Sequence, residues 1–189
     1  MFRIIPVALL CTASLLFAQD TAHHDHGDGL PVERPKVFLD KSPKIVAYQL
    51  KRLDNAQLLL VETATDDAKY LPVFHAILLR SGLAEKNRDE ALAGLVAINK
   101  SNRAIELLSA LKSLDGADKE QQRVGRQLSG ILLNEPQDVL TAHGDELKQA
   151  MTSSGVFQAT GFAGLIVAGQ SDAAWQQALI DEASRGAYL

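Results

Sequence analysis

The chain has 189 residues, of which 47% are hydrophobic but only 5% are aromatic, so its apolar surface is built mainly from Ala, Leu, Val and Ile. This length suits one ordinary domain or a short repeat array. The net charge is −4, and Lys and Arg are scattered among acids along the sequence, which argues against nucleic acid as a partner because phosphate binding requires a clustered basic surface.

The first residues have the layout of a secretory signal peptide. Arg3 supplies a positive charge, and an almost uninterrupted apolar run extends from Ile4 to Phe17. The alternative is an N-terminal transmembrane anchor, but the run is shorter than the roughly 20 residues that span a bilayer. We therefore predict a signal peptide over residues 1–18, cleaved after Ala18. The mature chain is expected to be exported, periplasmic or extracellular, and without a membrane span.

The only cysteine, Cys11, lies inside this apolar run. Leu9 and Leu10 precede it, whereas attachment of a lipid would require small residues there. Cleavage after Ala18 removes the thiol from the mature chain, and with it disulfides, thiolate zinc sites and covalent haem attachment. No cofactor is therefore predicted.

Residues 19–41 are predicted to form a flexible linker that contains histidines. His23, His24, Asp25 and His26 follow one another within it, and imidazole and carboxylate groups suit Zn, Cu or Ni. However, a flexible segment lacks the outer hydrogen bonds that orient metal-binding imidazoles. We interpret the tract as a solvated linker and assign no metal site, with weak metal binding as the alternative.

Residues 42–189 are predicted to form helices joined by short turns. Ser42 followed by Pro43 is typical of a helix start, and Asp54 or Asn55 is expected to cap a second helix. Gly82 is expected to close a third as the residue just past its end. Further apolar segments at helical spacing follow, and the later helices are expected at residues 70–80, 88–98, 101–114, 118–133, 136–142, 145–151, 156–168 and from 171 onward.

The clearest signal is a helix pair over residues 88–98 and 101–114. Each helix carries an apolar stripe at i, i+3 or i+4 and i+7: Ala91, Leu92, Leu95 and Ile98 in the first, and Ala104, Leu107, Leu108 and Leu111 in the second. The connection is so short that the two helices must be antiparallel. The sequence thus predicts an all-α, HEAT-like α-solenoid of antiparallel helix pairs, with an irregular closed helical bundle as the alternative. Gly125 and Gly130 are expected to allow close helix approach.

Three stretches of the chain resemble a known family. They are Pro35-Lys36-Val37-Phe38-Leu39-Asp40-Lys41-Ser42-Pro43-Lys44-Ile45-Val46-Ala47-Tyr48-Gln49-Leu50, Leu58-Leu59-Leu60-Val61-Glu62 and Thr65-Asp66-Asp67-Ala68-Lys69-Tyr70-Leu71-Pro72-Val73. They resemble the N-terminal, HEAT-like region of large exported planctomycete proteins in which a c-type cytochrome domain follows. The resemblance covers residues 35–114 well and 155–175 more loosely.

The haem-binding Cys-x-x-Cys-His motif of that family is absent from this sequence, so no haem ligand is carried over to any residue. The chain stops at Leu189, soon after the looser match, and we therefore expect a C-terminally truncated or split version of the longer protein. The resemblance implies that the missing cytochrome-type domain is a partner.

The sequence gives only weak evidence for catalytic residues. His75 and His143 are each expected to have structural roles on helices. Ser153 and Ser154, with His143 and Asp145 nearby, supply the residue types of a hydrolase triad but lack its strand–nucleophile–helix context. We assign no catalytic residue and expect no enzyme. The expected function is an exported helical-repeat scaffold for protein–protein or interdomain interaction, with a small metal or ligand carrier that uses the His tract as the alternative.

Overall fold

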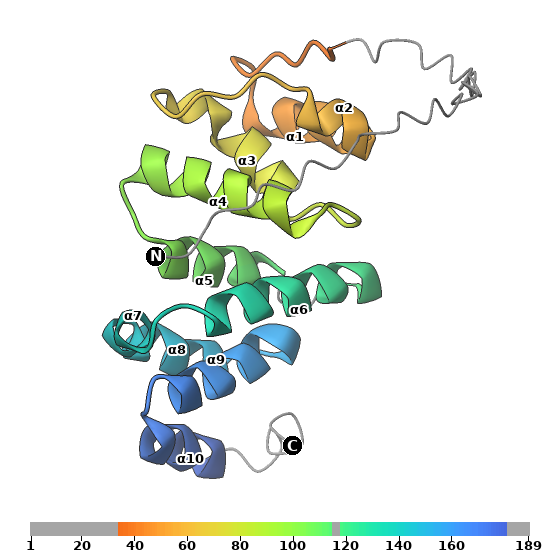
Figure 1. Ribbon diagram of the computed structural model, residues 1–189. Coiled ribbons are helices and arrows are strands. Elements are labelled where there is room, and N and C mark those ends of the chain that lie inside the picture. Colours follow the sequence, from red (N-terminus) through yellow and green to blue (C-terminus); the bar gives the residue numbers. More distant parts are fainter. Residues whose placement is uncertain (1–33, 115–117, 181–189) are drawn as a thin grey trace, which may run out of the picture. The chain divides into compact units, whose positions relative to one another are not determined.

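The computed structural model describes residues 34–114 and 118–180, which belong to one unit of the chain (Figure 1). The described residues form ten α-helices and one short 3-10 helix, and no strand occurs among them. This confirms the predicted all-α fold class. The predicted signal peptide, the His tract and most of the predicted linker lie outside the described residues.

The helices are short and follow one another closely along the chain. Their bounds are α1 (Pro43–Arg52), α2 (Asn55–Leu59), the 3-10 helix η1 (Ala68–Tyr70), α3 (Leu71–Leu78), α4 (Glu85–Asn99), α5 (Arg103–Ser113), α6 (Lys119–Leu133), α7 (Gln137–Ala142), α8 (Gly144–Met151), α9 (Gly155–Val167) and α10 (Ser171–Ile180).

Each helix packs mainly on helices that are close to it in the sequence. In the first half, α1 packs on α3, α3 on α4, α4 on α5 and α5 on α6. In the second half, α9 is the shared neighbour, since α6, α7, α8 and α10 all contact it. Figure 1 shows α4 and α5 running in opposite directions from their short connection, which confirms the predicted antiparallel pair.

The predicted apolar stripes of this pair face the core. Every member of the two stripes is buried except Ile98, which is partly buried and packs against the core. The same hydrophobic cluster continues from Val46 on α1 to Ala178 on α10. The helical spacing of leucine and alanine therefore predicted the buried faces correctly.

Helix starts follow the sequence signals only in part. The Asp54 carboxylate accepts a hydrogen bond from the Gln57 N–H (2.8 Å), and the Gln57 side chain accepts one from the Asp54 N–H (3.2 Å), a reciprocal cap of α2. Ser42 precedes α1 as predicted, but its side chain makes no capping hydrogen bond. The start predicted at Ser101 was wrong, because Lys100 adopts a left-handed backbone (φ 52°) and Asn102 caps α5 instead.

Gly82 has a positive φ of 76° but does not close α3 as predicted, because that helix already ends at Leu78. Its backbone instead turns the chain toward α4.

Close helix approach occurs at a glycine other than those predicted. A Cβ atom added to Gly130 would meet no atom within 4 Å, and one added to Gly125 would make ordinary contacts at 3.4 Å or more. At Gly161 on α9, an added Cβ would lie 2.5 Å from the carbonyl oxygen of Leu147 on α8. The backbones of α8 and α9 therefore touch at Gly161, where only glycine fits.

The Arg80 side chain binds free carbonyl groups at the end of α1. Arg80 donates hydrogen bonds to the carbonyl oxygens of Leu50 (2.7 Å) and Leu53 (3.0 Å) at the end of α1. The last carbonyls of a helix have no partner within the helix, and a guanidinium group offers several donors in a fixed fork. Arg80 thereby ties the segment after α3 to α1.

The segment before α1 also packs against the helices. Val37 and Leu39 are partly buried against the core, and the Phe38 N–H donates to the Gln49 side chain on α1 (3.1 Å). From the sequence, these residues were expected in the flexible linker. Their alternating apolar side chains hold them on the domain instead.

Candidate functional site: a groove between α1, α3 and α6

The main candidate site is a groove of about 650 Å³ that lies between α1, α3 and the start of α6. Its apolar surface comes from side chains of two neighbouring helices: Ala47 and Leu50 on α1, and Pro72, Ala76 and Leu79 on α3. Its polar lining is Lys51, His75, Arg80, Ser81, Glu120 and Gln121. Volumes of this size are typical of ligand-binding clefts.

The walls of this groove are held by specific hydrogen bonds. The Arg80 side chain lines the groove and is tied to the Leu50 and Leu53 carbonyls of α1. Asn55 donates to the Ser81 carbonyl oxygen (3.1 Å), which anchors the turn after α3. These bonds link α1 and α2 to the end of α3 and so hold two walls of the groove together.

His75 lines the groove and is half-buried. Burial lowers the pKa of its imidazole, and the negative charge of Glu106 on α5 opposes part of this shift. A neutral imidazole has one donor and one acceptor nitrogen. The side chain predicted to be structural is thus also available to a bound partner at neutral pH.

The charges around the groove have both signs. Lys51 lies on the α1 side and Glu120 on the α6 side, so the groove is not a selective site for phosphate, which needs converging cations. An apolar floor with a mixed polar rim suits side chains of a helix or peptide.

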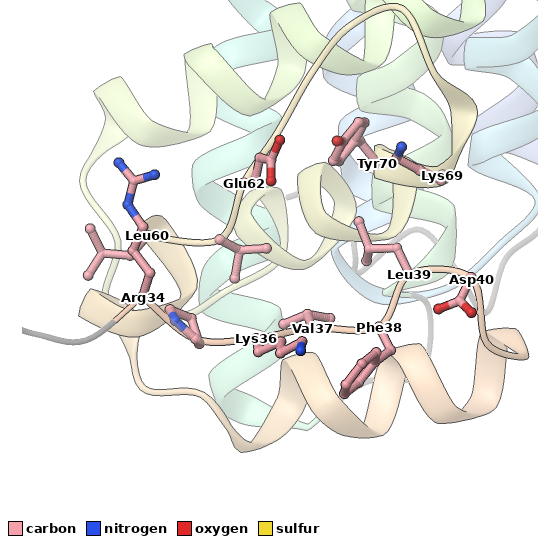
Figure 2. Close-up of a pocket in the computed structure, with 12 residues that line it drawn as sticks. Arg34, Lys36, Val37, Phe38, Leu39, Asp40, Leu60, Glu62, Lys69 and Tyr70 are labelled. Atoms are coloured by element: carbon pink, nitrogen blue, oxygen red, sulfur yellow. The ribbon is translucent and has the colours of Figure 1, made fainter.

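A second hollow lies between the extended residues 34–40 and the chain around Leu60 and Tyr70, with a volume of about 530 Å³. Figure 2 shows Arg34, Lys36 and Asp40 on one side of it, and Glu62 and Lys69 on the other. Its lining is more polar than that of the groove, and Lys69 is already paired with Asp67 (3.0 Å). The groove is therefore the stronger candidate.

His143 and Asp145 do not form a triad-like pair. His143 lies between α7 and α8, where its Nε2 atom is 3.0 Å from the Asn102 side-chain nitrogen, and its Nδ1 atom is 3.6 Å from the Glu146 carboxylate. The Asp145 carboxylate instead contacts Lys148 (3.4 Å). His143 and Asp145 therefore contact different partners and are not arranged as in a hydrolase triad.

Sequence reasoning missed the polar contacts that hold neighbouring helices together. Arg103 on α5 pairs with Glu135 (2.7 Å) and Asp89 (3.0 Å), and its pKa is raised chiefly by the hydrogen bond to Glu135 and further by the one to Asp89. These partners are far apart in the sequence, and no local spacing rule relates them. The groove was missed for the same reason, because it joins three separate helices.

No group of three or more His, Cys, Asp or Glu side chains among residues 34–114 and 118–180 could hold a metal ion. None of the helices in this part of the chain combines the length and the hydrophobicity that a membrane span requires. No protein-family model, curated protein or solved structure matches the chain. The resemblance to planctomycete cytochrome-domain proteins therefore stays a prediction.

Proposed function

We propose that this protein is an exported scaffold of the HEAT-like α-solenoid type, and that its groove binds a helical or extended segment of a protein partner. The observation that carries the proposal is the groove itself, with its apolar floor from α1 and α3 and its hydrogen-bonded walls. The proposed partner is another protein or a cytochrome-type domain.

The packing order of the helices supports a repeat stack over a closed bundle. The main contacts of α1 are with α3, and those of α10 are with α8 and α9. In a solenoid, each unit contacts its neighbours in the sequence, whereas a closed bundle brings distant helices together around one axis. Arg80 and Arg103 add polar links between neighbouring helices of this kind.

The lining of the groove supports a peptide ligand. Leu50, Ala76 and Leu79 form an apolar floor on which apolar side chains of a partner can pack. Peptide-binding grooves use such apolar floors for affinity and their polar rims for orientation. Here His75 and Glu120 are the rim groups that orient the partner.

The proposal is tested by selecting displayed random peptides on the full chain and measuring their affinity for two variants. Ala76→Glu places a charge on the groove floor, while Ala97→Glu places the same charge on the exposed side of α4. We expect selected peptides with apolar residues at helical spacing to bind Ala76→Glu at least about tenfold more weakly, with unchanged binding to Ala97→Glu. Equal affinity for wild type and both variants would refute binding in the groove.

A further inference from the structure

Basic residues gather on α1 and the segment before it. Six of the 19 Lys and Arg residues lie between residues 34 and 52, with Asp40 as the single acid in this stretch. All six are exposed: Arg34, Lys36, Lys41, Lys44, Lys51 and Arg52. The prediction that Lys and Arg are scattered among acids was therefore wrong for residues 34–52.

Helical geometry places three of these cations around one aromatic ring. α1 buries Val46 and Leu50 against the core, so Tyr48 lies on the opposite face. Lys44 and Arg52 are at i−4 and i+4 from Tyr48, while Ile45 and Lys51 are at i−3 and i+3. Residues at these spacings are neighbours on a helix surface.

The apolar members of this surface are unusually exposed. Tyr48 is 61% exposed, Ile45 48% and Phe38 47%. Phe38 joins α1 through the hydrogen bond from its N–H to Gln49. We call this surface, made of Lys36, Phe38, Lys44, Ile45, Tyr48, Lys51 and Arg52, the basic-aromatic face.

The charges of the basic-aromatic face are not neutralised within the described part of the chain. There, no carboxylate forms an ion pair with Lys44, Lys51 or Arg52. The Arg52 guanidinium instead lies 5.6 Å from the centre of the Tyr48 ring, and the Lys36 ammonium 5.3 Å from that of Phe38. Lys44 also lies in the first turn of α1, where the helix dipole disfavours a cation.

We propose that the basic-aromatic face docks the protein on an anionic lipid bilayer. Lysine and arginine side chains reach the negatively charged headgroups, and aromatic and aliphatic side chains enter the interfacial region. Charge complementarity supports this occupant, because the face carries four cations, and the single acid of residues 34–52, Asp40, is paired with Lys41 (3.4 Å). This function is separate from the proposed scaffold function. Lys51 also lines the groove, but the other six members of the basic-aromatic face do not.

A bilayer fits this face better than a nucleic acid does. Single-stranded nucleic acids stack bases on free aromatic ring faces, whereas Tyr48 and Phe38 each already have a cation over the ring. Ile45 gives a phosphate backbone nothing to bind, but it adds favourable apolar burial in a membrane interface.

The test measures partition of the full chain onto vesicles of phosphatidylcholine alone and of equimolar phosphatidylcholine and phosphatidylglycerol, at low and high salt. Two charge-matched variants are compared. The first reverses Lys44, Lys51 and Arg52 to Glu, and the second reverses the exposed Lys86, Lys112 and Arg123 on α4, α5 and α6. A third variant, Ile45→Ser with Tyr48→Ser, tests the apolar contribution.

We expect wild type to prefer the anionic vesicles and to lose this preference at high salt. Each cation near an anionic surface contributes about a fivefold factor. Loss of three cations alone should weaken binding about 100-fold, and the three added carboxylates are repelled by the surface, so the first variant should bind at least about 100-fold more weakly. The second variant should bind within a few-fold of wild type, since its cations lie on other helices, and the serine variant should bind about tenfold more weakly.

Three results would overturn the proposal. One is equal binding of the first variant and wild type to anionic vesicles. Another is equal partition of wild type onto both vesicle types. The third is displacement of wild type from anionic vesicles by a duplex oligonucleotide that binds as tightly, because the face would then recognise polyanions in general.

Discussion

The guanidinium of Arg88 on α4 donates a hydrogen bond to the carbonyl oxygen of Leu78, the last residue of α3. The same group donates to the Arg80 carbonyl (2.6 Å) and to the Gln127 side chain on α6 (3.1 Å). Arg88 is only 1% exposed, and burial lowers its pKa, yet guanidinium stays charged in proteins. One buried cation thus joins three helices through uncharged oxygens.

Arg88→Met is therefore expected to destabilise the fold by about 3 kcal/mol, because it leaves buried carbonyl groups without donors. Chemical denaturation followed by circular dichroism measures this change. Arg88→Lys should recover little, since an ammonium group cannot reproduce the fork of donors. Arg123→Met on the exposed side of α6 is the control and should change stability by less than about 0.5 kcal/mol; similar losses for both Met variants would contradict the assigned role of Arg88.

The buried stripe of α5 provides a second prediction. Leu108→Ala should lower the free energy of unfolding by about 2–5 kcal/mol, because the side chain is only 6% exposed and its loss leaves a cavity. Lys112→Ala on the exposed side of the same helix should cost less than about 0.5 kcal/mol. Thermal or denaturant unfolding of both variants measures the difference, and equal costs would mean that the assignment of faces is wrong.

Alanine substitutions at two glycines should change the free energy of unfolding in opposite directions. Gly161→Ala pushes a methyl group into the Leu147 carbonyl oxygen and is expected to destabilise the fold by about 2 kcal/mol or more. Gly130 lies inside α6 with open space around it. Gly130→Ala should therefore stabilise the fold by about 0.5–1 kcal/mol through helix propensity. The midpoints of urea unfolding report both signs, and a stabilising Gly161→Ala would show that α8 and α9 do not touch there.

The lowered pKa of His75 predicts that the free energy of unfolding depends on pH. Burial lowers its pKa in the folded state, so the unfolded chain binds the proton more readily as the pH falls below about 6.5. Stability should be fully present above that pH and decline below it, by at most about 1.4 kcal/mol per pH unit. His75→Gln should lack this component of the slope while all other titrating groups are retained. Urea unfolding of both proteins across pH 5–8 measures the difference, and identical slopes would contradict the shift.

The sequence predicts those features of the fold that depend on residues close together in the chain. The leucine and alanine stripes of α4 and α5 are local patterns, and they identified the buried faces. The reciprocal cap at Asp54 is likewise encoded within four residues. By contrast, the contact at Gly161 depends on which face of α9 meets α8, and no local spacing contains that information.

The candidate site was less predictable for the same reason. Its floor combines Leu50 on α1 with Ala76 on α3, and its far wall is Glu120 on α6. His75 was visible in the sequence as a polar residue among apolar ones, but its position beside this groove follows only from helix packing. The basic-aromatic face combines α1 with the segment before it, and the hydrogen bond between Phe38 and Gln49 that joins the two is not encoded in a local spacing.

The groove between α1, α3 and α6 is proposed to bind a protein segment. A nuclear magnetic resonance titration of the isotope-labelled chain with a peptide from the selection tests this binding amide by amide. If the peptide binds in the groove, chemical-shift changes should be concentrated at the amides of Ala76, Leu79 and Gln121. The Ala76→Glu variant should show no such changes. Shifts confined to α9 and α10, or unchanged by Ala76→Glu, would contradict the claim.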